Sequence, residues 1–195
     1  MRYPAGHKDR VRAKIVSAAS RRFRGRGGAG VAIADLMRDL KLTHGGFYRH
    51  FGGKEELFNE AFLESVAKAK AKMLAAARAA EPGRQLEAIV DTYLSAWHCG
   101  HPAEGCPMAA LTAEIGRHAG STRAAFDRVV RLHAADFAPF MPAGTLAERE
   151  RTAMVLFAGM AGVLNAARAV SDEALRRAML EQARALFIQA FGPRP

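Results

Sequence analysis

Residues 43–58 read THGGFYRHFGGKEELF and hold the clearest structural signal in this chain. The pattern predicts a short helix with aromatic and basic side chains, a break at Gly52 and Gly53, and a new helix that opens with Lys54. Apolar residues just upstream recur at the i, i+3, i+4 and i+7 positions of an amphipathic helix. Two helices joined by a turn at residues 41–43 form a helix-turn-helix, whose second helix enters the DNA major groove. The upstream apolar residues are Ile33, Leu36, Met37 and Leu40.

The positive charge of the chain is concentrated around this motif. The chain has 29 Lys and Arg against 19 Asp and Glu, a formal surplus of +10. Residues 1–54 carry 13 basic and 3 acidic side chains, whereas residues 55–195 carry 16 of each. A polyanionic partner accounts for this distribution, because Lys and Arg that neutralise phosphates release counterions and so supply non-specific DNA affinity. A basic face kept only for solubility is the alternative.

Composition predicts an all-α protein without membrane spans. Half of the 195 residues are hydrophobic, and no alternating strand pattern persists. The N-terminus lacks the apolar core of a signal peptide. The most apolar stretch, Thr152–Ala167, is shorter than the roughly 20 residues that a bilayer needs and contains Asn165, so we expect a buried helix. Two cysteines make no disulfide framework, which favours a reducing cytoplasm.

Periodicity and breaker residues predict about nine helices in two parts. Residues 1–53 are expected to form a three-helix DNA-binding head. Residues 54–195 are expected to form a ligand-binding and dimerisation body, whose first helix, 54–80, connects the two parts. The expected helices cover about residues 8–24, 33–40, 44–51, 54–80, 84–98, 107–117, 121–138, 146–170 and 171–191.

The head resembles the TetR family of bacterial transcription regulators. The resemblance rests on the Phe23…Gly27 region, on residues 33–37 and above all on Thr43–Phe58. It is strong over the first third of the chain and extends to the remainder only in helical layout. It implies a homodimer whose two heads bind a palindromic operator, and a body that releases DNA when a small molecule binds. Tyr48 and His50 match the family's phosphate-contacting Tyr and His.

The residues of the predicted recognition helix divide between packing and DNA contact. Phe47 and Phe51 share one helical face and are expected to pack on the preceding helices. Thr43 can cap the helix and reach a phosphate, and Arg49 points away from the packed face. The paired glycines either let the backbone approach base edges closely or only mark a loop. The predicted DNA-binding residues are Thr43, His44, Gly45, Gly46, Tyr48, Arg49, His50 and Lys54.

Lys54 gives the sharpest single argument for phosphate contact. A cation in the first turn of a helix opposes the macrodipole, at a cost of about 0.3–1 kcal/mol. A phosphate docked at that helix end reverses the sign of this contribution. Lys8, Arg10, Arg12 and Lys14 are expected either to add backbone contacts or to form a frayed, solvated arm.

Three positions depart from the family pattern. The family usually has Ser or Thr where this chain has Ala32, so a helix cap or phosphate contact is lost. The family usually has Gly where Lys41 stands, so a left-handed backbone at Lys41 would cost about 1–2 kcal/mol. Gly46 also replaces a common Thr. These departures bear on operator sequence and affinity rather than on the fold.

Aromatic residues and methionines of the body predict an apolar effector pocket with a polar mouth. Residues of these types at helical spacing are also typical of an ordinary core. No cofactor is expected. His98, Cys99, His101 and Cys106 are residues of the types that bind metals. A metal site is not expected there, because their spacing fits no closed zinc pattern. The predicted ligand-binding residues are Tyr93, Trp97, Cys106, Met108, Phe126, Met154 and Phe157.

Cys106 supports an alternative, a redox- or electrophile-sensing repressor. Pro107 favours the first position of a helix, which places Cys106 near the N-cap. A helix N-terminus lowers the pKa of a thiol and raises its thiolate fraction. Cys99 is the candidate resolving partner. A buried structural cysteine is the competing interpretation.

The last two helices, about residues 146–191, are expected to form the homodimer interface. Small residues in the first of them permit close helix approach, and Leu175, Met179, Leu186 and Phe187 supply apolar area on the second. Two such helices from each subunit would build a four-helix interface. An intramolecular core is the alternative.

Three classes of function compete. A cytoplasmic repressor that a small apolar ligand releases from double-stranded operator DNA explains most features. An enzyme is not expected, because no nucleophile elbow, phosphate loop or metal-ligating motif stands at recognisable spacing, although an unrecognised site remains the alternative. An architectural DNA-binding protein without a ligand is disfavoured by the large neutral body.

Overall fold

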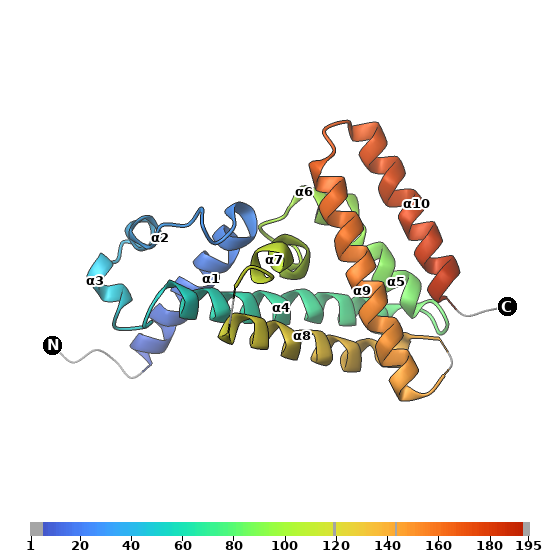
Figure 1. Cartoon of the computed structure of the whole chain (residues 1–195), viewed down its shortest axis with the longest axis horizontal. Helices are drawn as coiled ribbons and strands as arrows, with labels where there is room; N and C mark the ends of the chain where they lie inside the picture. Colours follow the sequence, from blue (N-terminus) through green and yellow to red (C-terminus); the bar gives the residue numbers. More distant parts are fainter. Residues whose placement is uncertain (1–5, 119, 143, 193–195) are drawn as a thin grey trace.

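The computed structural model describes residues 6–118, 120–142 and 144–192, and it is helical throughout, which confirms the all-α fold (Figure 1). Three helices form the head: α1 (His7–Arg26), α2 (Ile33–Asp39) and α3 (His44–Phe47). The long helix α4 (Lys54–Ala79) runs from the head along the length of the body. The head and the body therefore share one continuous helix.

The head is held together by an aromatic core between α1, α3 and α4. Phe47 and Phe51 stack with ring centroids 5.4 Å apart, and Phe23 meets Phe58 edge-on at 5.1 Å. These four rings are almost fully buried together with Leu36, so the predicted packing face is confirmed. Full burial of each such side chain stabilises the fold by about 1.5–3 kcal/mol.

The recognition helix is shorter than the predicted 44–51. After α3 the backbone tightens, because the N–H of Arg49 bonds to the carbonyl of Gly46 and that of His50 to the carbonyl of Phe47. Two adjacent glycines weaken a regular helix by about 1 kcal/mol each. Burial of Phe51 at the far end then holds the segment in a compact turn.

The body contains six further α-helices and one 3₁₀ turn within the described residues. Along the chain, α4 packs against α5 and α8, α9 packs across α8, and α10 lies against α9 (Figure 1). The bounds are α5 (Gln85–Tyr93), α6 (Ala96–Gly100), α7 (Pro107–Ile115), α8 (Ser121–Phe137), η1 (Ala138–Phe140), α9 (Leu146–Ala169) and α10 (Glu173–Phe191).

The predicted single helix 84–98 is divided into α5 and α6. Ser95 explains the division: its backbone is extended, and its hydroxyl accepts the N–H of His98 as the N-cap of α6. The ends of the last two helices are also set by caps. Thr145 and Glu148 form a capping box at the start of α9. Asp172 accepts the N–H groups of Ala174 and Leu175, so α10 begins two residues later than predicted.

The two C-terminal helices are incompletely covered. Helix α9 is long and apolar enough to cross a membrane, and 33% of its most apolar stretch is buried in the chain. Leu156, Met160 and Leu164 of α9 are buried, whereas Val155 is exposed. On α10 the buried residues are only Leu180 and Ala183. The core helix of a soluble protein can have the same length and composition, but it is mostly buried, whereas α9 is covered only in part.

Candidate DNA-binding surface and effector pocket

Thr43 organises the start of the recognition helix. Its backbone is extended, and its hydroxyl accepts the N–H of Gly46 at 3.2 Å, so the predicted N-cap is confirmed. Thr43 itself, His44, Gly45, Tyr48 and Arg49 are exposed, while Gly46 and His50 are half-buried. A Cβ added to Gly45 would meet no protein atom within 4 Å, so packing inside the chain does not explain this glycine.

A basic groove of about 830 Å³ lies beside α3. Four predicted DNA-binding residues share its lining with cationic side chains of α1 and of the turn after α2. Residues of α1 and α3 both line the groove, so a strand of nucleic acid in it would contact the two helices together. The lining is Gly6, His7, Lys8, Val11, Lys41, Leu42, Thr43, Gly46, Arg49 and His50.

Lys41 adopts a left-handed backbone, the conformation that suits the glycine usual at this position in the family. Its φ is 58°, and it is the single non-glycine residue with a positive φ in the described ranges. The turn closes when the N–H of Leu42 bonds to the carbonyl of Met37 at 2.9 Å. A lysine in this conformation costs about 1–2 kcal/mol relative to glycine, but it adds a cation to the groove. Ala32, as expected, supplies no side-chain cap to α2.

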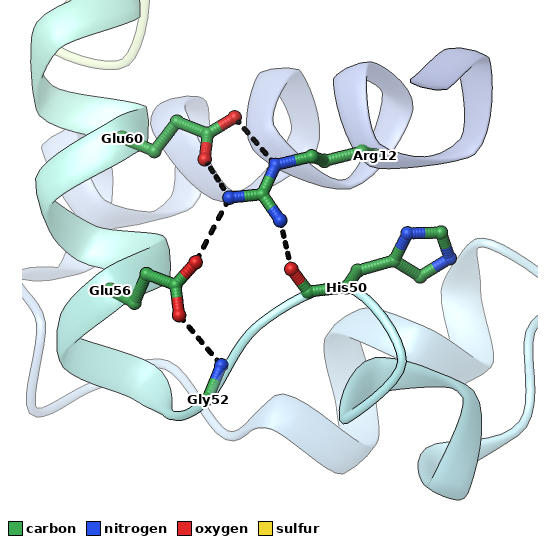
Figure 2. A network of polar contacts seen from close by, with 5 residues as sticks. All are labelled: Arg12, His50, Gly52, Glu56 and Glu60. Atoms are coloured by element: carbon green, nitrogen blue, oxygen red, sulfur yellow. Dashed lines mark hydrogen bonds and ion pairs between the residues drawn. The ribbon is translucent and has the colours of Figure 1, made fainter. Parts of the chain in front are cut away.

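His50 lines the basic groove and also bonds to α1 of the head. Its imidazole Nδ1 is buried without a hydrogen-bond partner, and its carbonyl accepts a hydrogen bond from Arg12 (Figure 2). Burial, and then the charges of Lys8 and Arg12, lower the pKa of His50. The lowered pKa favours the neutral ring in the free protein.

Lys54 lies exposed at the first position of α4, and the glutamates next to it are engaged elsewhere. Glu55 accepts hydrogen bonds from the hydroxyls of Ser121 and Thr122, and Glu56 accepts the N–H of Gly52 at 2.7 Å. Gly53, the N-cap, offers no side chain to the free N–H groups of α4. Across the described residues no ion pair or side-chain hydrogen bond reaches Lys54. An anion at this helix end would meet the lysine and the open N–H groups together.

The predicted effector pocket divides into two separate hollows, on either side of the start of α7. Tyr93, Trp97 and Cys106 line a narrow cavity of about 40 Å³ among α4, α5 and α6. Met108, Phe126 and Met154 line a hollow of about 430 Å³ among α7, α8 and α9. The expectation of one shared pocket was wrong, because Cys106 and Met108 stand two residues apart and face different neighbours.

Phe157 lines neither hollow. It is buried in an aromatic cluster, 4.6 Å from Phe137 and 5.5 Å from His133 between ring centroids. Its apolar type suited a pocket as well as a core, and the core interpretation is the one that the packing supports. Sequence reasoning missed Val130, Thr112 and Asn165, which complete the larger hollow.

Cys106 is the N-cap of α7, as predicted, but its environment is the opposite of a reactive thiol's. It is buried, and burial raises the pKa of the thiol although Tyr93 donates a hydrogen bond to it. The prediction of a lowered pKa was wrong because loss of water outweighs the helix N-terminus here. Cys99 is likewise a buried free thiol. No three potential metal ligands gather within the described part of the chain.

His98 connects α5 to the start of α7. Its Nδ1 donates to the carbonyl of Tyr93 at 2.6 Å, and its Nε2 accepts the N–H of Cys106 at 2.7 Å. Both ring nitrogens are used, so the ring is held neutral. Burial lowers the pKa of His98 to about 4. The residue is therefore a structural link rather than the metal ligand that its type suggested.

Besides α4, the body contacts the head through α7 and the segments on either side of it. Glu114 of α7 accepts the N–H of Gly28 at 2.7 Å, and Arg24 of α1 donates to the carbonyl of Ala103 at 2.7 Å. His118 stacks on Phe58 with ring centroids 5.4 Å apart. Movement of α7 in the body would therefore reach the head directly.

The head has a helix-turn-helix beside a basic groove, and the helical body contains a cavity large enough for a small molecule. This combination is typical of a DNA-binding transcription regulator. The matching family model is described as bacterial regulatory proteins, tetR family, and covers residues 15–61. The match to the tetR family model therefore covers most of the head and the start of α4. The named relatives of the chain are transcription regulators, not enzymes.

Individual relatives agree with this assignment. The HTH-type transcriptional regulator LmrA of Bacillus subtilis is 31% identical over 105 residues, which span 53% of this chain and 56% of LmrA. A TetR-family regulator from Cytophaga hutchinsonii superimposes with a TM-score of 0.79 at 20% identity, covering 99% of this chain and 100% of its own. A regulator from Saccharomonospora viridis, solved in complex with choline, gives 0.69 at 16% identity, covering 95% and 100%. At these identities the structures support the fold alone.

Proposed function

We propose that the chain is a cytoplasmic, homodimeric repressor that binds a palindromic operator and leaves it when a small apolar molecule enters the body. The observation that carries the DNA-binding part is the surface around α3. A capped recognition helix lies beside a basic groove, and the unpaired Lys54 stands at the bare N-terminus of α4, seven residues after the end of α3. In this proposal residues 1–53 are the DNA-binding head and residues 54–195 the ligand-binding and dimerisation body.

Each predicted contact has a distinct role in this complex. Lys54 and Tyr48 hold phosphates and fix the register of the head. His44 and Arg49 face base edges or phosphates, and the bare backbone at Gly45 permits close approach to the duplex. Thr43 positions the helix start through its cap.

The test is a Lys54→Ala and Tyr48→Ala double variant. Both side chains are exposed, so the variant should keep its thermal midpoint. Loss of one cationic phosphate contact should reduce the salt slope of binding by about 1. Affinity is measured on a duplex that the parent protein selects from a random-sequence pool. A double variant that binds this duplex as tightly as the parent at low salt would refute the proposal.

We assign the effector to the larger hollow between α7, α8 and α9. Its volume of about 430 Å³ is within the range of small-molecule sites, whereas the cavity at Trp97 holds about one water molecule. The lining is mainly apolar, and the hydroxyl of Thr112 already bonds to the carbonyl of Met108. Asn165 is the remaining polar side chain, which suits a neutral ligand with one or two polar atoms.

Gly162→Leu tests the pocket. A Cβ at Gly162 meets no atom within 4 Å, so the leucine extends into the hollow without displacing the core. The variant should still bind the selected duplex but should lose thermal stabilisation by compounds that stabilise the parent. Ala96→Leu, at the rim of a different hollow, is the control. An architectural protein would stay on the duplex with every compound in the panel.

A further inference from the structure

We propose that Arg12 is a positioning residue of the DNA-binding head, which fixes the segment after the recognition helix without touching DNA. This assignment rests on the proposed DNA-binding function and adds a residue that lies outside the helix-turn-helix. Arg12 belongs to the basic set of α1, whose members are expected either to contact the DNA backbone or to form a solvated arm. Arg12 differs from the others because its guanidinium bonds to Glu56, Glu60 and His50 of the chain itself.

The guanidinium of Arg12 is enclosed by acceptors from α4 and from the turn after α3 (Figure 2). Its Nε donates to Glu60 at 3.2 Å, and its Nη2 donates to Glu56 at 3.0 Å. Nη2 also donates to the second carboxylate oxygen of Glu60, which makes that pair bidentate. Nη1 donates to the carbonyl of His50.

Few donors of Arg12 remain for an outside ligand. Four of its five N–H groups take part in the bonds just described. The flat face of the guanidinium lies over the Phe51 ring, 4.3 Å from its centroid. The hydrogen bond to Glu60 raises the pKa of Arg12, so the side chain stays charged in this cluster. Reaching a phosphate would require breaking a bidentate ion pair.

The cluster holds both ends of the turn that follows the recognition helix. Arg12 fixes the carbonyl of His50, and Glu56 fixes the N–H of Gly52 at 2.7 Å. This turn ends in two glycines, whose backbone is the least restrained of any residue. Arg49 and the ring of His50 project from the same turn into the basic groove. Their aim at the duplex therefore depends on an anchor 38 residues away in the sequence.

Arginine suits this position in a way that lysine does not. A planar fork can bond to two carboxylates and a carbonyl at once while it stacks on a ring, whereas an ammonium is a compact point charge. The arginine also neutralises carboxylates that lie within two turns of Lys54 and would otherwise repel a phosphate there. Arg12 thus supports DNA binding through geometry and through compensation of Glu56 and Glu60.

The decisive variant is Glu60→Gln, because charge and positioning predict opposite signs. Removing a negative charge from the head should tighten DNA binding if only electrostatics matters. If the cluster positions the turn, affinity for a duplex selected by the parent protein should instead fall about tenfold. Glu64→Gln, one turn further along α4, removes the same charge outside the cluster and is the matched control. Circular dichroism and thermal melting confirm that each variant is folded.

Arg12 itself is tested with two substitutions on the same duplex. Arg12→Lys keeps the charge and should also bind about tenfold more weakly. Arg12→Gln should leave the salt slope unchanged, whereas Lys54→Gln should reduce it by about 1. The double variant Arg12→Lys, Glu60→Gln should bind no more weakly than either single one, because both act through one cluster.

Three results would overturn the assignment. Glu60→Gln binds as tightly as the parent or more tightly; Arg12→Lys retains full affinity; or Arg12→Gln lowers the salt slope as Lys54→Gln does. The first two would leave the cluster a purely structural role, and the third would make Arg12 a phosphate contact. A parent protein that selects no duplex would refute the proposed function itself, which is a different outcome.

Discussion

The carboxylate of Glu114, near the end of α7, accepts the backbone N–H of Gly28 in the loop after α1, with 2.7 Å between Oε2 and N. This bond crosses from the body to the head. Residues 108, 109, 112 and 113 of the same helix line the larger hollow. One short helix thus forms part of the proposed effector site and part of the contact with the head.

Glu114→Ala should uncouple the two parts. The N–H of Gly28 loses its acceptor, which should lower the free energy of unfolding by about 1–3 kcal/mol. Effectors should still bind the body, but their effect on operator affinity should decrease, because the variant lacks the hydrogen bond that connects α7 to the head. Chemical denaturation and effector titrations on the selected duplex measure the two quantities. Glu181→Ala, an exposed carboxylate of α10, is the control and should change neither. Unchanged coupling in Glu114→Ala would remove this route.

Lys41→Gly should weaken DNA binding and raise the free energy of unfolding. Glycine relieves the left-handed strain of about 1–2 kcal/mol but costs about 0.5–1 kcal/mol in the unfolded chain, so a net gain of roughly 0.5–1 kcal/mol is expected. The groove loses one cation, so DNA binding should weaken and its salt slope should fall by about 1. Lys41→Ala separates the effects, because alanine keeps the strain and lacks the charge. A glycine variant that melts below the alanine variant would contradict the strain argument.

Two buried histidines should make the protein sensitive to mild acid. Burial lowers the pKa of His98 and of His133 to about 4. Above an unfolded-state pKa of about 6.5 neither state binds the proton, so nothing is lost there. Between pH 6.5 and 4 the unfolded chain binds protons that the folded chain does not, so stability falls as pH falls, by on the order of 3 kcal/mol for each histidine.

His133→Leu tests the acid sensitivity. The Nε2 of His133 is buried without a partner, so leucine removes an unsatisfied polar atom while it keeps apolar contact with Phe137 and Phe157. The variant should lose part of the drop in thermal midpoint between pH 6.5 and 4. His118→Leu, at a half-exposed ring, serves as the comparison and should retain the drop. A pH profile of His133→Leu identical to the parent's would show that His133 contributes nothing.

Local signals in the sequence predicted the head better than the body. The cap at Thr43 follows from one residue and its immediate neighbours, and the points raised at Ala32 and Lys41 follow from comparing single residues with the family pattern. The role of Arg12 did not follow, because it depends on how α1 crosses α4, which brings together residues 48 positions apart. The same limit applies to the pocket. Helical spacing shows which residues are apolar, but not that Cys106 and Met108 face different sides of α7.

The cysteine prediction failed for a related reason. The N-cap position of Cys106 is a local property and was predicted correctly. Its thiol pKa depends on burial by segments distant in the sequence, which no local pattern reveals. Desolvation then decides the sign of the shift. Positions fixed by neighbours in sequence were thus predictable, and properties fixed by packing were not.

Leu186→Glu should separate the proposed dimer. Leu175 and Leu186 are 58% and 53% exposed and lie eleven residues, or three turns, apart on α10, so they mark one apolar face. A carboxylate in the centre of a symmetric helical interface appears twice, once from each subunit, and burial of both charges is strongly unfavourable. Light scattering at micromolar concentration should therefore change from dimer to monomer, and affinity for the palindromic duplex should fall because one head binds alone.

Leu132→Glu is the matched control for this substitution. Leu132 is 53% exposed, the same fraction as Leu186, but it lies on α8 rather than on the last two helices. The control should remain dimeric and should bind the selected duplex like the parent. If Leu132→Glu dissociates the protein and Leu186→Glu does not, the interface includes α8 instead of the exposed face of α10. A monomeric parent would exclude the dimer altogether. The exposed apolar residues of α9 and α10 would then require a different partner to cover them.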